Sequence, residues 1–346
     1  MDKNYKVAII GCGGRGDKHA LGFDADNRCK VTALVDIKRE AAEKINKKYN
    51  FKANIYQDYR EMLVREKVDI VAICLWTDLH LPVFMDCAQA GIKAALVEKP
   101  MAITWENSKK YRQIVEKTGC QLTFGHQRRF AEGNQLARKW IKQGKFGEIT
   151  RMDMFSPHHI LDCGTHTIDQ ALSFNQEKDV KWVLGAIDTR KIISIYDVKA
   201  ETGAAGTMVF ENDVNANIQL GLPDQEMWGG VRVEGTRGFI EVFWDGNYGK
   251  GKVYDDPQWE PPEVNTDDEI QMKKMISNAV DSLNNGKEPE LSYKKALRAA
   301  EIIFAFYESV YRHKLIKLPL TEGIKNPFYT MLEQGQISYD EMDKMP

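Results

Sequence analysis

The chain has 346 residues, of which 43% are hydrophobic and 28% are charged. A chain of this length corresponds to about two domains, and this composition is typical of a globular protein and excludes a disordered one. The 48 basic and 50 acidic side chains leave a formal net charge of −2. This balance provides no basic surface for a polyanion, so we expect no nucleic-acid partner.

The apolar runs and the cysteines indicate the compartment. Only residues 7–10 form an apolar run before Gly11, which is too short for the core of a signal peptide, and no later run approaches the ~18 apolar residues of a membrane helix. We therefore expect a cytoplasmic protein without a membrane partner. The six cysteines form no C-x-x-C pair, which argues against a disulfide framework or a zinc ribbon.

Residues 1–125 alternate short β-branched runs with longer helical patterns. This alternation predicts parallel strands joined by helical crossovers, and most of the runs are apolar on both faces, as buried parallel strands are. The expected strands are Lys6–Ile10, Lys30–Val35, Asp69–Leu75, Ala94–Val97 and Gln121–Phe124. The N-terminal part is therefore predicted to be a doubly wound α/β domain.

The pattern changes after residue 126. Helical periodicity over residues 128–142 and 162–174 gives way to strand-like stretches with short turns, which predict an antiparallel sheet. These stretches are Val180–Ile187, Gly206–Glu211, Asn215–Leu220, Val231–Glu234 and Phe239–Phe243. Two amphipathic helices should follow, at 267–284 and 292–313. We predict an α+β domain with a large open antiparallel sheet over residues 126–320, and a tail over 321–346.

A glycine-rich turn, Gly11-Cys12-Gly13-Gly14-Arg15-Gly16, directly follows the first expected strand. A G-x-G-x-x-G between a strand and a helix is the dinucleotide-binding signature of a Rossmann domain. Gly11 allows the tight turn, Gly13 leaves room for the pyrophosphate, and Gly16 lets the helix approach the strand. We predict that Gly11, Gly13, Gly14, Arg15 and Gly16 bind the cofactor; a plain glycine turn is the alternative.

Asp36 ends the second expected strand, twenty positions after Gly16. A carboxylate there accepts hydrogen bonds from the ribose hydroxyls of NAD and repels the 2′-phosphate of NADP. Lys38 and Arg39 lie nearby and could partly neutralise that repulsion. The sequence predicts NAD, with NADP as the less favoured cofactor.

Lys99 follows the strand Ala94–Val97 within Glu98-Lys99-Pro100. Ligands of open α/β sheets bind beyond the carboxyl ends of the strands, so the ammonium group is expected in the cofactor cleft. The alternative is a surface lysine beside a turn.

The segment Asp162–Asp169 contains two carboxylates and His166 at i, i+4 and i+7 spacing, which predicts that one face of an amphipathic helix carries all three. A carboxylate one turn before an imidazole can orient it for proton transfer near neutral pH. The alternatives are an N-cap aspartate with a satisfied histidine, or a metal site that adds His158 and His159. We expect no metal.

Five motifs, in this order, resemble the Gfo/Idh/MocA family, the glucose-fructose oxidoreductase and inositol dehydrogenase group. They are the glycine turn followed by His19, Thr77-x-x-His80, Glu98-Lys99-Pro100, Gly125–Phe130 and Asp162-x-x-x-His166-x-x-Asp169. The resemblance extends over nearly the whole chain. It implies an NAD-binding Rossmann domain over residues 1–125 and a substrate-binding and oligomerisation domain over 126–320.

The resemblance also implies roles for residues. The implied catalytic group is Lys99, Asp162 and His166. Thr77, His80 and Glu98 are implied to bind the cofactor. The implied substrate contacts are Gln127, Arg128, His159 and Asp169.

The reaction implied is the interconversion of a secondary alcohol and a ketone on a sugar, glycoside or cyclitol. Whether Lys99 or His166 accepts the proton is left open by the sequence. The alternatives are a glycoside lyase or hydrolase that keeps NAD bound, and a sensor or regulator that binds NAD without catalysis. The open sheet is expected to form a homodimer or homotetramer.

Two departures from the family pattern concern the substrate side. Ser156–Leu161 stands where the family usually has a glycine-rich stretch, and Trp76 stands where it often has proline. Trp76 could stack on a sugar ring, but a core tryptophan is the favoured interpretation.

Overall fold

The computed structural model describes residues 4–157, 159–195, 198–221, 229–321, 326–337 and 341–344. The chain divides into two compact units. The first consists of Met1–Ala102, Glu106–Gln127 and Asp268–Leu297, and the second of Ile103–Trp105, Arg128–Asp267 and Arg298–Pro346. Asp268–Leu297 follows most strands of the second sheet in the sequence but belongs to the first unit.

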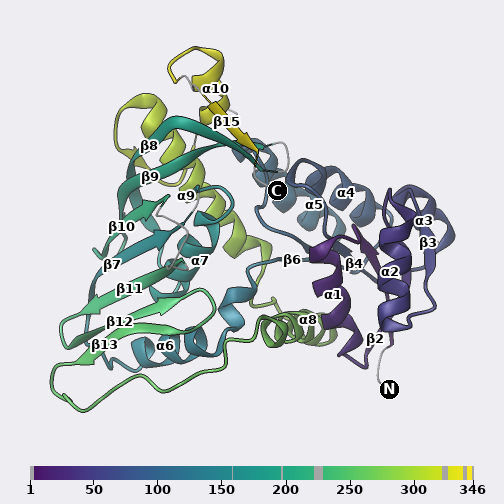
Figure 1. Ribbon diagram of the computed structural model, residues 1–346, viewed down its shortest axis with the longest axis horizontal. Helices are drawn as coiled ribbons and strands as arrows, with labels where there is room; N and C mark the ends of the chain where they lie inside the picture. Colours follow the sequence, from purple (N-terminus) through teal and green to yellow (C-terminus); the bar gives the residue numbers. More distant parts are fainter. Residues whose placement is uncertain are drawn as a thin grey trace. The chain divides into compact units, whose positions relative to one another are not determined.

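The first unit is built on a parallel sheet, which has six strands in the described part of the chain (Figure 1). The strand order is β3 (Asn54–Tyr56), β2 (Cys29–Val35), β1 (Tyr5–Ile10), β4 (Ile70–Ile73), β5 (Ala94–Val97) and β6 (Gln121–Phe124). The order reverses between β1 and β4, which makes the sheet doubly wound. The predicted α/β domain is confirmed, and β3, which was not predicted, extends one edge.

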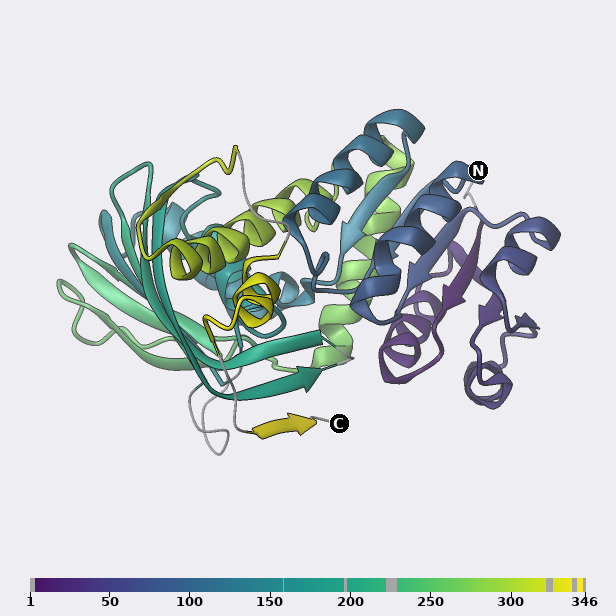
Figure 2. The same ribbon diagram turned by 90° about the horizontal axis from the view of Figure 1, so that it is seen from above.

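Helices cover both faces of this sheet, as Figure 2 shows. They are α1 (Gly14–Asp24), α2 (Arg39–Tyr49), α3 (Tyr59–Arg65), α4 (Thr77–Gln89), α5 (Trp105–Thr118) and α8 (Asp268–Asn285). The Asp58 side chain caps α3 by accepting from the Arg60 amide at 2.8 Å. Helix α8 packs against α1 so closely that a Cβ on Gly22 would lie 2.5 Å from the Ile276 side chain. The packing of α8 therefore completes the first unit.

The second unit is built on a larger sheet, nine-stranded in the described residues. Its order is β13 (Tyr248–Val253), β12 (Gly238–Phe243), β11 (Gly230–Gly235), β7 (Ile149–Ser156), β10 (Asn215–Leu220), β9 (Val198–Phe210), β8 (Val180–Ile195) and β14 (Ile316–Lys317), with β15 (Glu341–Lys344) pairing with β8. The predicted large sheet is confirmed, but it is mixed and not purely antiparallel. Strands β7 and β10 pair in parallel, and α7, β8 and β9 lie between them in the sequence. Strand β7 was not predicted.

Among the described residues, helices lie along one face of the large sheet only. Along β10 the residues alternate between exposed and buried, beginning with exposed Asn215 and buried Ala216, and Figure 2 shows α9 along one face. The helical elements of the second unit are η1 (Gln127–Phe130, shared with the first unit), α6 (Glu132–Lys142), α7 (Gly164–Phe174), α9 (Tyr293–Arg312, whose first turn belongs to the first unit) and α10 (Pro327–Glu333). The second face therefore carries half-exposed side chains.

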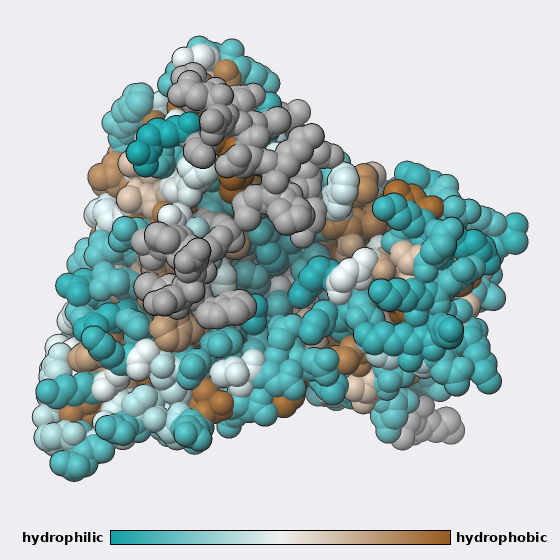
Figure 3. Space-filling model, in the orientation of Figure 1, coloured by the Kyte–Doolittle hydropathy of each residue, from teal (hydrophilic) through white to brown (hydrophobic). Residues whose placement is uncertain are grey.

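The surface of the molecule is mostly hydrophilic on the face drawn in Figure 3. Within the described residues, no helix has both the length and the apolar character to cross a membrane.

Candidate functional site

The glycine turn of the first unit is tightly packed at its ends and open in its middle. Gly11 has a φ of +94°, and a Cβ there would lie 2.3 Å from the Cys74 carbonyl oxygen. A Cβ on Gly16 would lie 2.0 Å from the Gly11 carbonyl oxygen, whereas nothing lies within 4 Å of one on Gly13 or Gly14. Gly13 caps α1 without a side-chain hydrogen bond. The turn thus offers open space beside a helix N-terminus, which fits a pyrophosphate.

Asp36 is fixed against this turn by the backbone. Its Oδ2 accepts a hydrogen bond from the Cys12 amide at 2.7 Å, and its Oδ1 accepts one from the Lys38 amide at 2.8 Å. Each carboxylate oxygen can accept a further hydrogen bond. The Arg39 side chain is exposed and its Nε pairs with Glu43 at 2.9 Å. The geometry therefore leaves Asp36 able to accept from ribose hydroxyls.

Glu98, directly before Lys99, lies in a buried charged cluster. Its Oε1 accepts from Arg15 Nη2 at 2.8 Å and lies 2.8 Å from His19 Nε2. Burial alone would raise the pKa of the Glu98 carboxyl, but Arg15 and His19 lower it well below its ordinary value. Lys99 itself is half-buried at the end of β5.

Helix α4 contributes two of the predicted cofactor residues. Thr77 is its first residue and is buried, with Trp76 as the N-cap. Nε2 of His80 lies 2.9 Å from the Leu75 carbonyl oxygen, and Nδ1 lies 3.2 Å from that of Pro100. Burial lowers the pKa of His80 against the effect of these carbonyls. His80 thus joins the loops that follow β4 and β5.

Trp76 differs from its favoured interpretation as a core residue. The side chain is 51% exposed, so that interpretation is wrong. The position next to Leu75, whose side chain would contact a Cβ on Gly11 at 3.1 Å, places Trp76 close to the glycine turn.

Gln127 ends the first unit and is a candidate substrate contact. The residue is only 3% exposed, and its Oε1 has no hydrogen-bond partner within the described part of the chain. A buried amide oxygen of this kind requires an explanation, and a ligand hydroxyl would provide one. Arg128, the next residue, belongs to the second unit and is half-buried.

The histidine segment of the second unit begins later than predicted. Helix α7 starts at Gly164 with Cys163 as its N-cap, so Asp162 lies in the preceding turn and only His166 and Asp169 share the helix. Every residue of α7 is buried, so the predicted amphipathic character is wrong. The Asp162 amide donates to Nδ1 of His159, a buried residue, at 3.4 Å. His158 lies outside the described residues.

His166 packs against an aromatic residue that the sequence analysis did not identify. The ring centroids of His166 and Trp244 are 5.6 Å apart, and the Trp244 indole donates to Thr167 Oγ1 at 3.0 Å. No local spacing links residue 244 to the α7 segment. Trp244 therefore supports the imidazole from a strand end far along the chain.

Asp169, a predicted substrate contact, is held by Arg129. Arg129 Nε and Nη2 donate to the two carboxylate oxygens at 2.7 and 2.8 Å, and Nη1 pairs with Glu177. Both residues of the bidentate pair are 3% exposed. The charge of Asp169 is thus already compensated within the second unit.

Glu201 is a further buried carboxyl group of the second unit, and nothing in its local sequence indicated it. Its Oε1 accepts from the Ile160 amide and its Oε2 from the Tyr307 hydroxyl, both at 2.7 Å. Burial raises the pKa of Glu201. Through Ile160 this carboxyl group fixes the loop that leads to Asp162.

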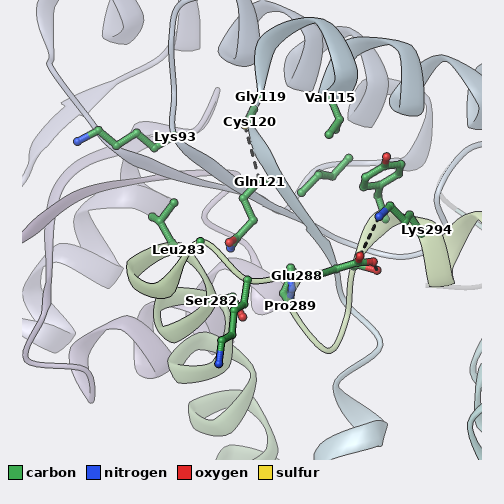
Figure 4. Close-up of a pocket in the computed structure, with 15 residues that line it drawn as sticks. Lys93, Val115, Gly119, Cys120, Gln121, Ser282, Leu283, Glu288, Pro289 and Lys294 are labelled. Carbon is green, nitrogen blue, oxygen red and sulfur yellow. Dashed lines mark hydrogen bonds and ion pairs between the residues drawn. The ribbon is translucent and has the colours of Figure 1, made fainter.

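A pocket of about 380 Å³ lies elsewhere in the first unit (Figure 4). It is lined by Lys93 and Cys120, which precede β5 and β6, and by residues after α8, among them Glu288 and Lys294, which pair at 2.8 Å. The amino ends of parallel strands lie at the edge opposite to the glycine turn. This pocket is therefore separate from the cofactor residues. No group of three His, Cys, Asp or Glu side chains suited to a metal occurs within the described residues.

The first unit is similar in sequence to known proteins. Residues 5–126 match the Gfo/Idh/MocA family, described as an oxidoreductase family with an NAD-binding Rossmann fold. Over these residues the chain is similar to the Gfo/Idh/MocA family. NAD is accordingly the cofactor of this domain.

The relatives of this protein are distant. The 4-carboxy-2-hydroxymuconate-6-semialdehyde dehydrogenase of Sphingobium sp. (strain NBRC 103272 / SYK-6) is 27% identical over 232 residues, which are 60% of this chain and 73% of that protein. The D-glucoside 3-dehydrogenase of Escherichia coli (strain K12) is 27% identical over 187 residues, 48% of this chain and 53% of that protein. An inositol 2-dehydrogenase of Burkholderia cenocepacia (strain HI2424) is 26% identical over 250 residues, 70% and 68% respectively.

Solved structures share the fold of this protein. The WlbA dehydrogenase from Bordetella pertussis, in complex with NADH and UDP-GlcNAcA, has a TM-score of 0.78 at 20% identity, over 92% of this chain and 99% of that one. The myo-inositol 2-dehydrogenase from Lactobacillus plantarum has a TM-score of 0.76 at 18% identity, over 92% and 100%.

Proposed function

We propose that the protein is an NAD-dependent dehydrogenase that interconverts a secondary alcohol and a ketone on a sugar, glycoside or cyclitol. The observation that carries the proposal is the open glycine turn beside Asp36, at the edge of the sheet where Lys99 follows β5. Bound NAD supplies the nicotinamide C4 that accepts or returns the hydride. The relatives named D-glucoside 3-dehydrogenase and inositol 2-dehydrogenase support the substrate class.

Three residues carry the acid-base chemistry in this proposal. His166 accepts the hydroxyl proton, Lys99 stabilises the developing alkoxide with its ammonium group and relays the proton, and Asp162 orients the imidazole. The packing of Trp244 against His166 restricts the ring and so supports a proton-transfer role. Lys99 is the rival proton acceptor.

The remaining roles concern binding. We assign Gly11, Gly13, Gly14, Arg15, Gly16, Asp36, Thr77, His80 and Glu98 to the cofactor site. We assign Gln127, Arg128, His159 and Asp169 to the substrate site. The unpartnered Oε1 of Gln127 supports the second assignment, since a polyol offers many hydroxyl donors.

The open face of the large sheet is proposed to pair with a second copy of the chain as a homodimer or homotetramer. The half-exposed side chains on the strands support this, because an open sheet of this size requires cover. Analytical ultracentrifugation tests the oligomer, and a monomer at micromolar concentration would refute it.

The deciding experiment for the activity is a cofactor-reduction screen over neutral sugars, glycosides, cyclitols, sugar acids and sugar phosphates at one pH. We expect NADH formation with a neutral ring polyol and the largest kcat/KM in that class. Preference for acids or phosphates by more than about tenfold would overturn the substrate class. Glycoside cleavage without net NADH would identify a lyase or hydrolase, and NAD binding without any turnover would identify a sensor.

A further inference from the structure

We propose that Glu98 acts on the cofactor through Arg15 and His19, as a positioning residue that joins the phosphate-binding turn to Lys99, and does not itself contact NAD. The inference concerns the cofactor site and rests on the NAD binding of the proposed function. It redefines the part that Glu98 plays there.

The first argument is that the Glu98 carboxylate is enclosed and already engaged. The side chain is 5% exposed. Its Oε1 accepts a hydrogen bond from Arg15 Nη2 at 2.8 Å and lies 2.8 Å from His19 Nε2. His19 is fully buried on the inner side of α1. A ribose hydroxyl would have to displace a charged donor to reach this oxygen, which costs more than the neutral hydrogen bond returns.

The other carboxylate oxygen of Glu98 lies close to the backbone at Gly125. A Cβ placed on Gly125, directly after β6, would lie 2.9 Å from Oε2 of Glu98. The carboxylate therefore fills the space between α1 and the end of β6. A side chain at position 125 would require the Glu98 carboxylate to move.

The cluster of Glu98, Arg15 and His19 links the glycine turn to Lys99. Arg15 lies between Gly14 and Gly16 in the first turn of α1, whose amide groups face the open space beside Gly13. Glu98 is covalently joined to Lys99. The hydrogen bonds of Glu98 therefore fix the position of the phosphate-binding amides relative to the lysine, and loss of those bonds lets both relax.

The fourth argument is electrostatic. The low pKa of Glu98 keeps the carboxylate charged at neutral pH, and its charge is directed to Arg15. Arg15 in turn points to Glu98 and to the sulfur of Met272, at 3.9 Å. The negative charge of Glu98 and the positive charge of Arg15 cancel, so this ion pair holds α1 in place without changing the net charge of the cofactor site.

The test is a double-mutant cycle on the dissociation constant for NAD, measured by titration where circular dichroism shows every variant folded. The variants are Glu98→Gln, Arg15→Met and the pair together, with Asp17→Asn as the control. Asp17 lies in the same turn of α1, but its ion pair with Lys48 is exposed. We expect each single variant to weaken NAD about tenfold, the double variant to bind no more weakly than the weaker single one, and the control to match wild type.

Several outcomes would overturn the inference. If Arg15→Met left the NAD affinity unchanged while Glu98→Gln weakened it, Glu98 would be a direct ligand. If the loss of NAD affinity in the double variant equalled the sum of the two single losses, Glu98 would also be a direct ligand. A lower melting temperature with an unchanged affinity would mean a structural role only. If Glu98→Gln does not fold, the test uses two variants of His19. His19→Gln keeps a hydrogen-bond donor for Glu98 and should bind NAD more tightly than His19→Ala. Equal NAD affinities of these two variants would refute the proposal. Failure of wild type to bind NAD would instead refute the proposed function.

Discussion

Arg129 donates hydrogen bonds to both carboxylate oxygens of Asp169, at 2.7 and 2.8 Å, and both residues are almost completely buried. The third nitrogen of the guanidinium pairs with Glu177, which also accepts from Arg298 at 3.1 Å. The network ties η1, α7 and α9 together within the second unit. Asp169 therefore stabilises the fold in addition to any contact with a substrate.

The first prediction follows from that network. Asp169→Asn leaves the Arg129 guanidinium buried with half of its compensation, so the free energy of unfolding should fall by about 3–5 kcal/mol. Urea unfolding measures the change. The control is Asp255→Asn, which removes an exposed partner of Arg237 and should lower the free energy of unfolding much less than Asp169→Asn does. Wild-type stability together with a raised KM would make Asp169 a substrate ligand alone.

The second prediction separates chemistry from cofactor binding. Lys99→Met and His166→Ala should each lower kcat by about 10² to 10⁴, because general acid-base groups contribute that much to a rate. The dissociation constant for NAD should stay within a few-fold of wild type, since neither residue lies in the glycine turn. A variant that keeps the wild-type kcat would remove its residue from the mechanism.

The third prediction concerns the choice of dinucleotide. Asp36→Ser should reduce the preference for NAD over NADP by about tenfold or more, because the serine removes the charge that repels a 2′-phosphate. Fluorescence titration with both dinucleotides gives the ratio. Lys38→Ala tests the rival explanation: if wild type binds NADP as tightly as NAD and Lys38→Ala abolishes that binding, the lysine controls the selection.

The fourth prediction uses the raised pKa of Glu201. This carboxyl group binds its proton more tightly in the folded chain than in the unfolded one, so its contribution favours folding below the ordinary pKa of about 4.3 and declines as the pH rises through the folded pKa. Glu201→Gln cannot titrate, so its stability relative to wild type should increase from pH 4 to pH 8. Tyr307→Phe keeps the carboxyl group but removes a hydrogen bond that lowers its pKa, so the pH dependence should keep its sign and become larger than in wild type. A difference between Glu201→Gln and wild type that is independent of pH would contradict the assignment.

The fifth prediction concerns the exposed indole of Trp76. If its ring stacks on the apolar face of a sugar, Trp76→Ala should raise KM by about fivefold to tenfold, whereas Trp76→Phe should retain most of the affinity. The melting temperature of both variants should match wild type, because half of the side chain is exposed. An unchanged KM in Trp76→Ala would exclude stacking on the substrate.

The sequence predicted the elements that are strongly patterned over a few residues. Strands β1, β2, β4, β5 and β6 are almost continuous apolar runs, and each was predicted. Strand β3 has only three residues and no buried one, so it carries no hydrophobic signal. Strand β7 was not predicted, although the buried Met152 and Met154 alternate with polar residues in its sequence.

The candidate site shows the same division between local and distant relationships. The glycine turn and Asp36 follow from local spacing, and the structure joins them by a hydrogen bond. The partners of Arg15, Arg129 and Tyr307 lie 83, 40 and 106 positions away. No periodicity links residues at such separations, because tertiary packing alone brings them together.

The position of α8 has a consequence for synthesis. The first unit needs Asp268–Leu297 to cover α1, yet that segment leaves the ribosome only after strands β7 to β13 of the large sheet. At about 5–20 residues per second, translation from Gln127 to Leu297 takes on the order of ten seconds. Throughout that delay the surface of α1 around Gly22 lacks the Ile276 side chain that covers it in the finished chain. The nascent first unit therefore leaves this part of α1 uncovered until α8 has been synthesised.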